Sequence, residues 1–252
     1  MKCKINGKEM IEKIESVLLK GKWNNGLNNK NTILCPSIVI SVGEGGMLYN
    51  ANTSTFVSNS FNLLEVNGAK AGKIAIDSEI LLKYLPKEEC IFQLKDNTLQ
   101  LVSERKTVKL PILERHENND SILFVQKNLI TPRDISKEVI ISEKTKLKTR
   151  IKVSSEELMN ALIDCEAVGN SVFKLEYDGD NLIVSSSKNS ESVTVVIEPI
   201  ESVGKKSIME FSTPLSKYLE GLVTILSFED ETPLSIISGN LKVLRAPRIE
   251  AW

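Results

Sequence analysis

The sequence predicts an α+β fold built from two duplicated domains, each a pseudo-symmetric pair of strand–helix–strands units. The main observation is a repeat: Lys-Tyr-Leu occurs at residues 83–85 and again 134 residues later, at 217–219. At the same offset Asp96 corresponds to Asp230. Each tripeptide is followed by an alternating apolar segment, an acidic turn and a second apolar segment. A period this long indicates a duplicated domain and not a solenoid of short repeats.

In the first half, a short strand in "CKING" precedes the helical pattern "KEMIEKIESVLLK". Its apolar residues recur at intervals of three and four, the period of an amphipathic helix. They are Met10, Ile11, Ile14, Val17 and Leu18. Strands joined by a tight turn follow in "SIVISVGEGGMLYNA", and a second strand–helix unit begins with "GKIAIDSEILLKYL".

The second half repeats this order. A strand in "IKV" precedes the helical pattern "SSEELMNALIDCEAV", for which Ser154 or Ser155 is a candidate N-cap. Asp178-Gly179 is a strong hairpin signal between the next two strands. Thr213-Pro214 suits the start of another helix, so four short helices are expected in all. The expected buried face of the first of these two helices consists of Leu158, Met159, Leu162 and Ile163.

The domain boundaries follow from the polar, turn-rich stretch between the halves. The predicted domains are 1–113 and 147–252, joined by a connector at 114–146. Within the connector "TPRDISKEVI" is expected to form an extra helical turn. The insertion "KGKWNNGLNNKN" after the first helix is expected to be a mobile loop.

Composition points to a folded intracellular protein with an aliphatic core. Hydrophobic residues make up 41% of the chain, whereas aromatic residues make up only 5%. No apolar run has the length of a membrane span, and the start of the chain has no apolar signal segment. The four cysteines are far apart and show no CxxC spacing, which is typical of reduced thiols in the cytoplasm or nucleus. Lys+Arg (32) and Asp+Glu (33) nearly cancel, so the distribution of charge matters more than its sum.

Signals for catalysis are weak. The single histidine, His116, lies in the charged run "LERHEN" with no nucleophile beside it. The stretch "GEGG" lies between strands and lacks the following helix of a phosphate-binding loop. No metal-ligand cluster is apparent. We therefore expect neither enzymatic activity nor a cofactor.

The duplicated pattern resembles the DNA sliding clamps, both the proliferating-cell-nuclear-antigen type and the bacterial β-clamp. The resemblance is carried best by "FSTPLSKYLEGL", "VTILSFEDETPLSII" and "VLRAPRIEAW" near the C-terminus. Nuclear-antigen clamps end in a similar "LAPRIE"-like strand and tail, into which Arg245 is inserted here. In the first half "KNTILCPSIVISV" and "LLKYLPKEECIFQLKDNTLQLVSERKTVKLPIL" are closer to a bacterial clamp. The resemblance covers nearly the whole chain except the Asn-rich insertion and much of the connector.

This resemblance implies a DNA sliding clamp, that is, a polymerase processivity factor that acts in DNA replication and DNA repair. Each domain is expected to place its helices on one face and its antiparallel sheets on the other. Two domains per chain imply a trimeric ring that encircles duplex DNA without sequence preference. The implied partners are DNA polymerase, other clamp-binding proteins and a clamp loader. Two alternatives remain: a subunit of a hetero-oligomeric or checkpoint-type ring, and a monomeric clamp-like protein that binds DNA or a polymerase.

Lysines on the helices are the candidate DNA-binding residues, because clamp helices line the hole. The alternative is an ordinary solvated helix face. One helix argues against a uniformly basic lining, since its solvent face carries Glu156, Glu157, Asn160 and Asp164. The candidate residues are Lys8, Lys13, Lys20, Lys22, Lys83 and Lys217.

Two further sets of residues follow from the resemblance. Ring closure joins edge strands of neighbouring subunits, and "ESVTVVIEP" is the expected edge in the second domain, with Val193, Val195 and Ile197 alternating along it. Client proteins of clamps insert a short apolar peptide beside the connector, and the tail adds contacts. The candidate partner-binding residues are Leu123, Phe124, Val125, Ala246, Pro247, Arg248 and Ile249. For the first three, core packing is the alternative.

Overall fold

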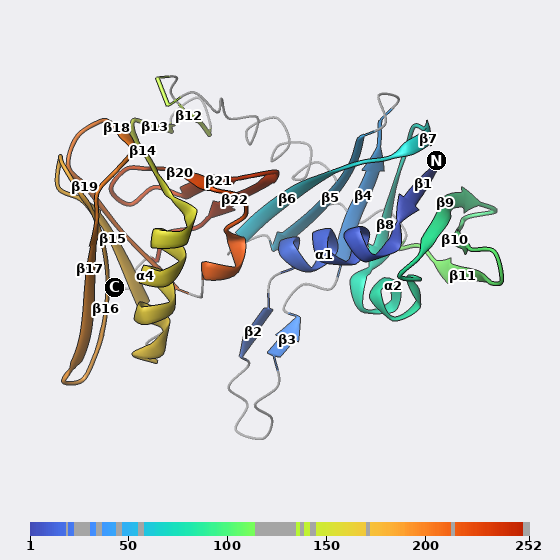
Figure 1. Cartoon of the computed structure of the whole chain (residues 1–252), viewed down its shortest axis with the longest axis horizontal. Coiled ribbons are helices and arrows are strands. Elements are labelled where there is room, and N and C mark those ends of the chain that lie inside the picture. The colour runs from blue at the N-terminus through green and yellow to red at the C-terminus, as the bar shows by residue number, and fades with distance from the viewer. Residues whose placement is uncertain are drawn as a thin grey trace. The chain divides into compact units, whose positions relative to one another are not determined.

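The chain forms two compact units (Figure 1). Unit 1 comprises Met1–Thr55 and Asn59–Leu123, and unit 2 comprises Phe56–Ser58 and Phe124–Trp252. This computed structural model describes residues 1–18, 20–22, 31–33, 37–43, 47–54, 58–113, 135–136, 139–141, 145–169, 172–212 and 215–248.

The described part of unit 1 contains two α-helices and two main antiparallel sheets. The helices are α1 (Gly7–Val17) and α2 (Ser78–Tyr84). The strands are β1 (Lys2–Asn6), β2 (Lys20–Lys22), β3 (Asn31–Ile33), β4 (Ser37–Val42), β5 (Met47–Ser54), β6 (Ser58–Glu65), β7 (Asn67–Lys70), β8 (Gly72–Asp77), β9 (Glu89–Lys95), β10 (Thr98–Val102) and β11 (Thr107–Pro111).

The two repeats of unit 1 exchange their first strands. The strand β1 pairs with β9, with Ile5 opposite Cys90, and so joins the order β11-β10-β9-β1-β7. The strand β8 pairs with β4, with Ile74 opposite Ile40, and so joins the order β6-β5-β4-β8. Each sheet therefore contains strands from both repeats.

One apolar core joins the helices of unit 1 to both sheets, and it is mostly aliphatic, as expected from the composition. Helix α1 buries one stripe at intervals of three and four residues. Helix α2 buries Leu81 in the same cluster. The fully buried members of this core include Met10, Ile14, Leu18, Ile38, Ile40, Ile76, Leu81 and Phe92.

Unit 2 repeats the arrangement. The helices in its described part are α4 (Ser155–Ala167) and the 3-10 turn η1 (Ser216–Tyr218). Its strands are β12 (Val139–Ile140), β13 (Lys146–Leu147), β14 (Thr149–Ser154), β15 (Val172–Tyr177), β16 (Leu182–Lys188), β17 (Glu191–Ile197), β18 (Glu201–Val203), β19 (Ser207–Ser212), β20 (Val223–Phe228), β21 (Leu234–Ser238) and β22 (Leu241–Arg245).

The predicted duplication is present in the topology. The order β18-β14-β20-β21-β22 matches β7-β1-β9-β10-β11 of unit 1, and β17-β16-β15-β19 matches β6-β5-β4-β8. Both Lys-Tyr-Leu tripeptides lie where a helical element ends, the first between β8 and β9 and the second between β19 and β20. The α+β class, the antiparallel sheets and the two-fold repetition are thus confirmed.

The fourth expected helix is present only as a short 3-10 helix. At the second Lys-Tyr-Leu the structure has only the three-residue turn η1, which has no side-chain cap hydrogen bond. The equivalent helix α2 is capped by Asp77, whose carboxylate accepts the backbone N–H of Glu79 and of Ile80. In η1 the Glu166 carboxylate instead accepts hydrogen bonds from the N–H and the hydroxyl of Ser216. Thr213 and Pro214 lie outside the described residues.

Three smaller expectations need correction. The base of the Asn-rich insertion is a two-stranded ladder, in which β2 pairs with β3. In the connector Val139–Ile140 is strand β12, paired with β13, and not part of a helical turn. The buried stripe of α4 includes the small residues Ala161 and Cys165, because they continue the spacing of Leu158 and Leu162. Ile163 is half exposed and Met159 is only partly buried.

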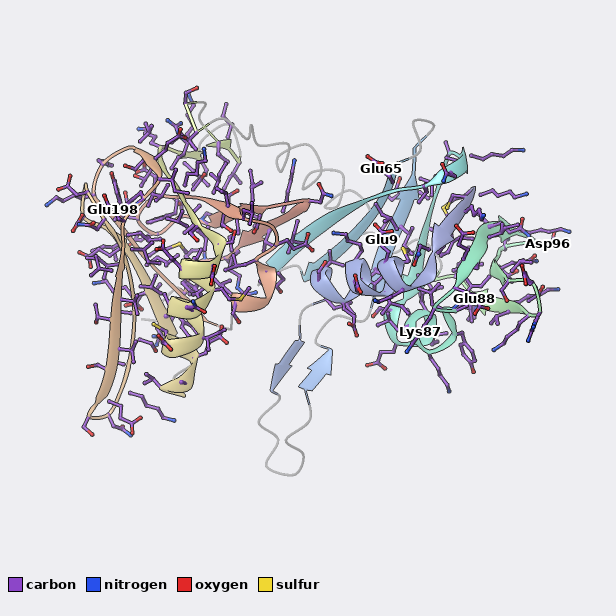
Figure 2. The ribbon with its side chains drawn as sticks, viewed as in Figure 1. Glu9, Glu65, Lys87, Glu88, Asp96 and Glu198 are labelled. Carbon is purple, nitrogen blue, oxygen red and sulfur yellow. The ribbon has the colours of Figure 1, made fainter. Side chains whose placement is uncertain are left out.

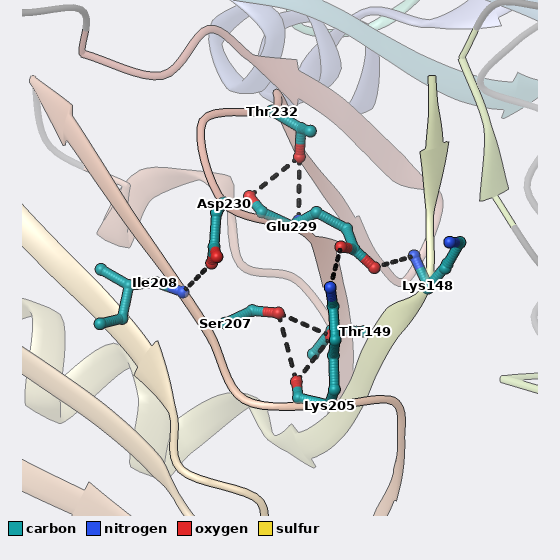
Figure 3. A network of polar contacts seen from close by, with 8 residues as sticks. All are labelled: Lys148, Thr149, Lys205, Ser207, Ile208, Glu229, Asp230 and Thr232. Carbon is teal, nitrogen blue, oxygen red and sulfur yellow. Dashed lines mark hydrogen bonds and ion pairs between the residues drawn. The ribbon is translucent and has the colours of Figure 1, made fainter. Parts of the chain in front are cut away.

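A polar network joins β14, β19 and the β20–β21 turn of unit 2 (Figure 3). The buried hydroxyl of Thr149 donates to the backbone oxygen of Lys205 (2.9 Å) and lies 2.9 Å from the hydroxyl of Ser207. The Glu229 carboxylate accepts the N–H of Lys148. The turn residue Asp230 accepts the N–H of Ile208 (2.7 Å). These contacts hold the two sheets of unit 2 together at this end.

Candidate nucleic-acid interface

The start of α1 is bonded to the segment that follows α2. The N–H of Gly7 donates to Glu88 O (3.1 Å), and the N–H of Lys8 donates to Lys87 O (3.1 Å). A Cβ on Gly7 would lie 1.6 Å from Pro86 O, so only glycine fits here. The contact brings the first turn of α1 to the end of α2, where Lys87 and Glu88 lie (Figure 2).

Unit 2 has the equivalent contact with the glycine on the other side. The N–H of Ser155, at the start of α4, donates to Leu222 O (3.0 Å), in the segment that follows η1. Gly221, which precedes Leu222, has φ +71°, a backbone conformation that favours glycine. The Ser155 hydroxyl continues into a buried chain with the hydroxyls of Thr224 and Ser238, each contact 2.8 Å long. Both helix starts are therefore fixed to the second repeat of their own unit.

The structure places the candidate lysines unequally. Lys8 is exposed in the first turn of α1, and Lys83 is exposed in the last turn of α2. Lys13, in the middle of α1, is partly buried. Lys20 and Lys22 belong to β2 and Lys217 belongs to η1, but the side chains of these three lie outside the described residues. Of the three candidate lysines whose side chains are described, Lys8 and Lys83 are thus exposed near the junction of α1 with the end of α2, whereas Lys13 is not.

Helix α4 presents the acidic face expected from its sequence. Glu156, Glu157, Asn160 and Asp164 are all exposed. The two glutamates lie in the first turn, where negative charge is stabilised by the helix dipole. This helix therefore contributes no cation that could contact a phosphate from its exposed face.

The strands β17 and β11 each lie at one end of a strand order. In β17 the candidate side chains Val193, Val195 and Ile197 occupy the more buried face, whereas Thr194 and Val196 are exposed. The turn between β16 and β17 has two residues, so the pair that closes it, Lys188 with Glu191, is a hydrogen-bonded pair.

Hydrogen-bonded pairs alternate along an antiparallel ladder, which fixes the direction of every N–H in β17. The N–H groups of Val193, Val195 and Ile197 point to β16, and those of Thr194 and Val196 point outward. In the β10–β11 hairpin the N–H of Ser103 donates to Lys106 O, so this pair is hydrogen-bonded. Alternation along the ladder then makes Gln100 and Lys109 a non-hydrogen-bonded pair, so the N–H of Lys109 points away from β10. Pro111, which has no N–H to offer, also occupies an outward position.

The C-terminal tail is attached to β19. The N–H of Arg248 donates to Glu210 O (2.7 Å), and its guanidinium lies 3.7 Å from the Glu210 carboxylate. Ala246 and Pro247 are partly buried and Arg248 is exposed. The other candidate partner-binding residues, Leu123, Phe124, Val125 and Ile249, lie outside the described residues.

Arg245, the residue inserted before the tail, is fully buried at the end of β22. It lies opposite Leu234 in β21. Burial lowers the pKa of its guanidinium, and the nearby Tyr218 acts in the opposite direction. The inserted residue is therefore buried and not part of an exposed surface.

The surface of unit 2 includes an open pocket of about 510 Å³. Aliphatic side chains and two glycines form most of its lining, with one ammonium group and one carboxylate among the polar groups. Its lining residues are Lys152, Glu220, Gly221, Val223, Ile225, Ile237, Gly239 and Asn240. Within the described residues no group of three or more His, Cys, Asp or Glu side chains could hold a metal ion.

The described cysteines are buried thiols without a catalytic environment. Burial raises the pKa of Cys3 to about 12 and that of Cys90 and Cys165 to about 11. Neighbouring acidic side chains add to the effect at Cys90 and Cys165. Because the thiolate is the nucleophile, these residues are unreactive at neutral pH. His116 lies outside the described residues.

None of the described helices is long and apolar enough to cross a membrane.

No protein-family model and no curated protein matches the sequence. Solved structures do match. A DNA polymerase III beta subunit from Eubacterium rectale superposes with a TM-score of 0.74 at 12% identity, over 98% of this chain and 65% of that one. The sliding clamp of Bacillus subtilis gives 0.71 at 15% identity, over 100% of this chain and 65% of that one.

A third structure matches in full. It is the A. fulgidus PCNA bound to the C-terminal region of FEN-1, with a TM-score of 0.69 at 14% identity, over 100% of this chain and 99% of that one. The chain thus spans about two thirds of the length of the bacterial clamps and the full length of the archaeal one. Its fold is that of the DNA sliding clamps throughout.

Proposed function

We propose that this chain, which has the sliding-clamp fold, closes into a homotrimeric ring around duplex DNA and tethers a DNA polymerase and other DNA enzymes to it. The observation that carries the proposal is the full-length match to a two-unit clamp, combined with two end strands that can pair between copies. The protein is a processivity factor without enzymatic activity of its own.

Charge and backbone geometry favour β17 against β11 of the next copy as the closing contact. Both strands have outward N–H groups over several residues. The surroundings of β11 are basic, with exposed Lys106 and Lys109, whereas β17 begins and ends beside exposed Glu191 and Glu198. Opposite charges across paired edges favour one register and discourage pairing of two identical edges. A head-to-tail contact of this kind closes into a ring when the rotation fits.

Sedimentation equilibrium tests ring closure. The wild-type mass should approach three times the 28.0 kDa of one chain. Thr194→Pro removes an outward N–H and should give a folded monomer, whereas the control Thr194→Ala keeps the N–H and should remain a trimer. Val195→Pro instead breaks a bond to β16 and should lower stability as well. If Thr194→Pro remains trimeric, β17 is not the closing edge.

We propose that the candidate lysines on the helices and on β2 contact DNA phosphates, with Lys8 and Lys83 at the α1–α2 junction as the residues to test first. Binding to duplex DNA should weaken as salt rises, because counterions are released from neutralised phosphates. A Lys8→Gln, Lys83→Gln variant should show a smaller salt slope, by about 0.9 for each phosphate that is no longer neutralised. The weakening should not depend on base sequence. If the slope is unchanged, these lysines form a solvated helix face only.

Client binding is proposed at the tail, because the archaeal clamp binds the C-terminal region of FEN-1. The residues concerned are Ala246, Pro247, Arg248 and Ile249. We also retain one alternative role, as a subunit of a hetero-oligomeric ring. The exposed acidic face of α4 favours it, since such a helix is better placed opposite a more basic subunit. A monomer by sedimentation that assembles only with a second protein would support this alternative.

A further inference from the structure

An exposed aromatic ring in unit 1 is approached by cations from two elements. Tyr84, at the end of α2, is 39% exposed. The Lys83 Nζ lies 5.3 Å from the centre of its ring. The Lys106 Nζ, from the turn between β10 and β11, lies 6.0 Å from the same centre. Both distances are in the range of cation–π contacts.

The ring is not needed for the core. Helix α2 buries Leu81 completely, and Leu85, its C-cap, is 6% exposed. These two side chains hold the helix against the sheets. Tyr84 instead keeps a large apolar surface in contact with solvent, which is unusual in a chain with few aromatic residues.

Further cations lie on the segments around this ring. Lys87 lies three residues after the end of α2, Lys8 is bonded through its N–H to Lys87 O, and Arg105 precedes Lys106. Within the part of the chain that the structure describes, none of the five cations forms an ion pair. Acidic groups also lie on these segments, namely Glu9, Glu79, Glu88 and Glu104. The five cations are Lys8, Lys83, Lys87, Arg105 and Lys106.

We infer that Tyr84 and these cations form a binding site for single-stranded nucleic acid. An unpaired base stacks on the Tyr84 ring, and Lys83, Lys106 and Arg105 contact the flanking phosphates. Aromatic stacking with a positive groove is how proteins bind single strands without sequence preference. A base pair within a duplex offers no free ring face, so the site distinguishes single strands from duplex.

The inference goes beyond the proposed function and does not require ring closure. An encircling clamp needs only phosphate contacts with duplex DNA, whereas this site takes up an unstacked base. The site would place displaced or template single strand at the end of α2. Because all its residues belong to unit 1, a monomeric chain would bind single strands as well.

Fluorescence anisotropy with a labelled oligothymidine of about 12 nucleotides tests the site directly, in the full-length protein. Tyr84→Ala should weaken binding at least about tenfold, whereas Tyr84→Phe should bind within about twofold of wild type because the ring remains. Lys106→Gln should reduce the salt slope by about 0.7, the value for one single-strand phosphate. The matched control is Lys70→Gln, an exposed lysine on β7 at the other end of the strand order, which should change little.

Two results would overturn the inference. In the first, Tyr84→Ala binds oligothymidine as tightly as wild type while Lys106→Gln weakens it, which would indicate a phosphate-only patch. In the second, an acidic peptide of equal charge competes as well as the oligonucleotide, which would indicate a protein-binding patch. If sedimentation shows that the protein is not a trimer but oligothymidine binding still depends on Tyr84, the proposed ring is rejected and the single-strand site is supported.

Discussion

The Gly7 contact predicts a large effect from one methyl group. In Gly7→Ala the new Cβ would lie 1.6 Å from Pro86 O and 2.9 Å from Glu88 O. An ordinary carbon–oxygen contact needs about 3.5 Å, so the segment after α2 must retreat by roughly 2 Å. That movement breaks the hydrogen bonds from Gly7 to Glu88 and from Lys8 to Lys87, both 3.1 Å long.

The cost follows from these broken hydrogen bonds. Two backbone hydrogen bonds are worth about 1 kcal/mol each, and the displaced segment also disturbs the packing of buried Leu85. We expect Gly7→Ala to lower the free energy of unfolding by about 2–4 kcal/mol. With an ordinary dependence on urea, this corresponds to a midpoint lower by about 1–2 M.

Urea unfolding followed by circular dichroism measures this effect, and Gly68→Ala is its control. Gly68 has φ +61° but nothing within 4 Å of a new Cβ. Its substitution therefore tests conformational strain without a clash and should cost about 1 kcal/mol. Amide hydrogen exchange at residues 7 and 8 should accelerate only in Gly7→Ala. Equal decreases in stability in the two variants would refute the argument from close contact.

Two further predictions concern unit 2 and the thiols. Thr149→Val removes the buried hydroxyl that binds Lys205 O and Ser207, and should lower the free energy of unfolding by about 1–3 kcal/mol. The control Ser190→Ala, at an exposed turn position, should change it little, and equal effects of the two variants in thermal unfolding would contradict the argument. In a Cys35→Ala variant, Cys3, Cys90 and Cys165 should react with a thiol reagent at pH 8 only as fast as the protein opens. Burial raises the pKa of these thiols, so they stay neutral in the folded protein at pH values where the unfolded chain ionises them. The free energy of unfolding should therefore fall as pH rises from the ordinary thiol pKa of 9.0 toward 11–12. Unfolding curves at alkaline pH would test this.

The repeat was the part of the fold most accessible from sequence. The Lys-Tyr-Leu tripeptides, 134 residues apart, occupy equivalent places in the topology because each ends the helical element that precedes a pair of antiparallel strands. The N-cap at Ser154 and the exposed acidic face of α4 also follow from local chemistry. Local signals sufficed because caps and faces depend on residues a few positions apart.

The rest depends on contacts that sequence patterns do not encode. Lys106 meets Tyr84 only because the β10–β11 turn packs back against the end of α2. The short polar strand β7, "NGAK", has no apolar alternation, and among the described strands it pairs only with β1. The alternating valines of β17 suggested the pairing residues, but the backbone direction assigns the outward groups to Thr194 and Val196.

The exchange of first strands between repeats has a consequence for how the chain reaches its native state. Lys2 pairs with Gln93, so β1 can find its place only after a loop of most of unit 1 has closed. Such non-local pairing slows folding, since the entropy of closure is lost before any contact of β1 compensates for it. During synthesis β1 and α1 would wait for β9 to leave the ribosome. A fragment that ends after β6 would lack both β9 and β8, and its two apolar sheet faces would remain open to aggregation.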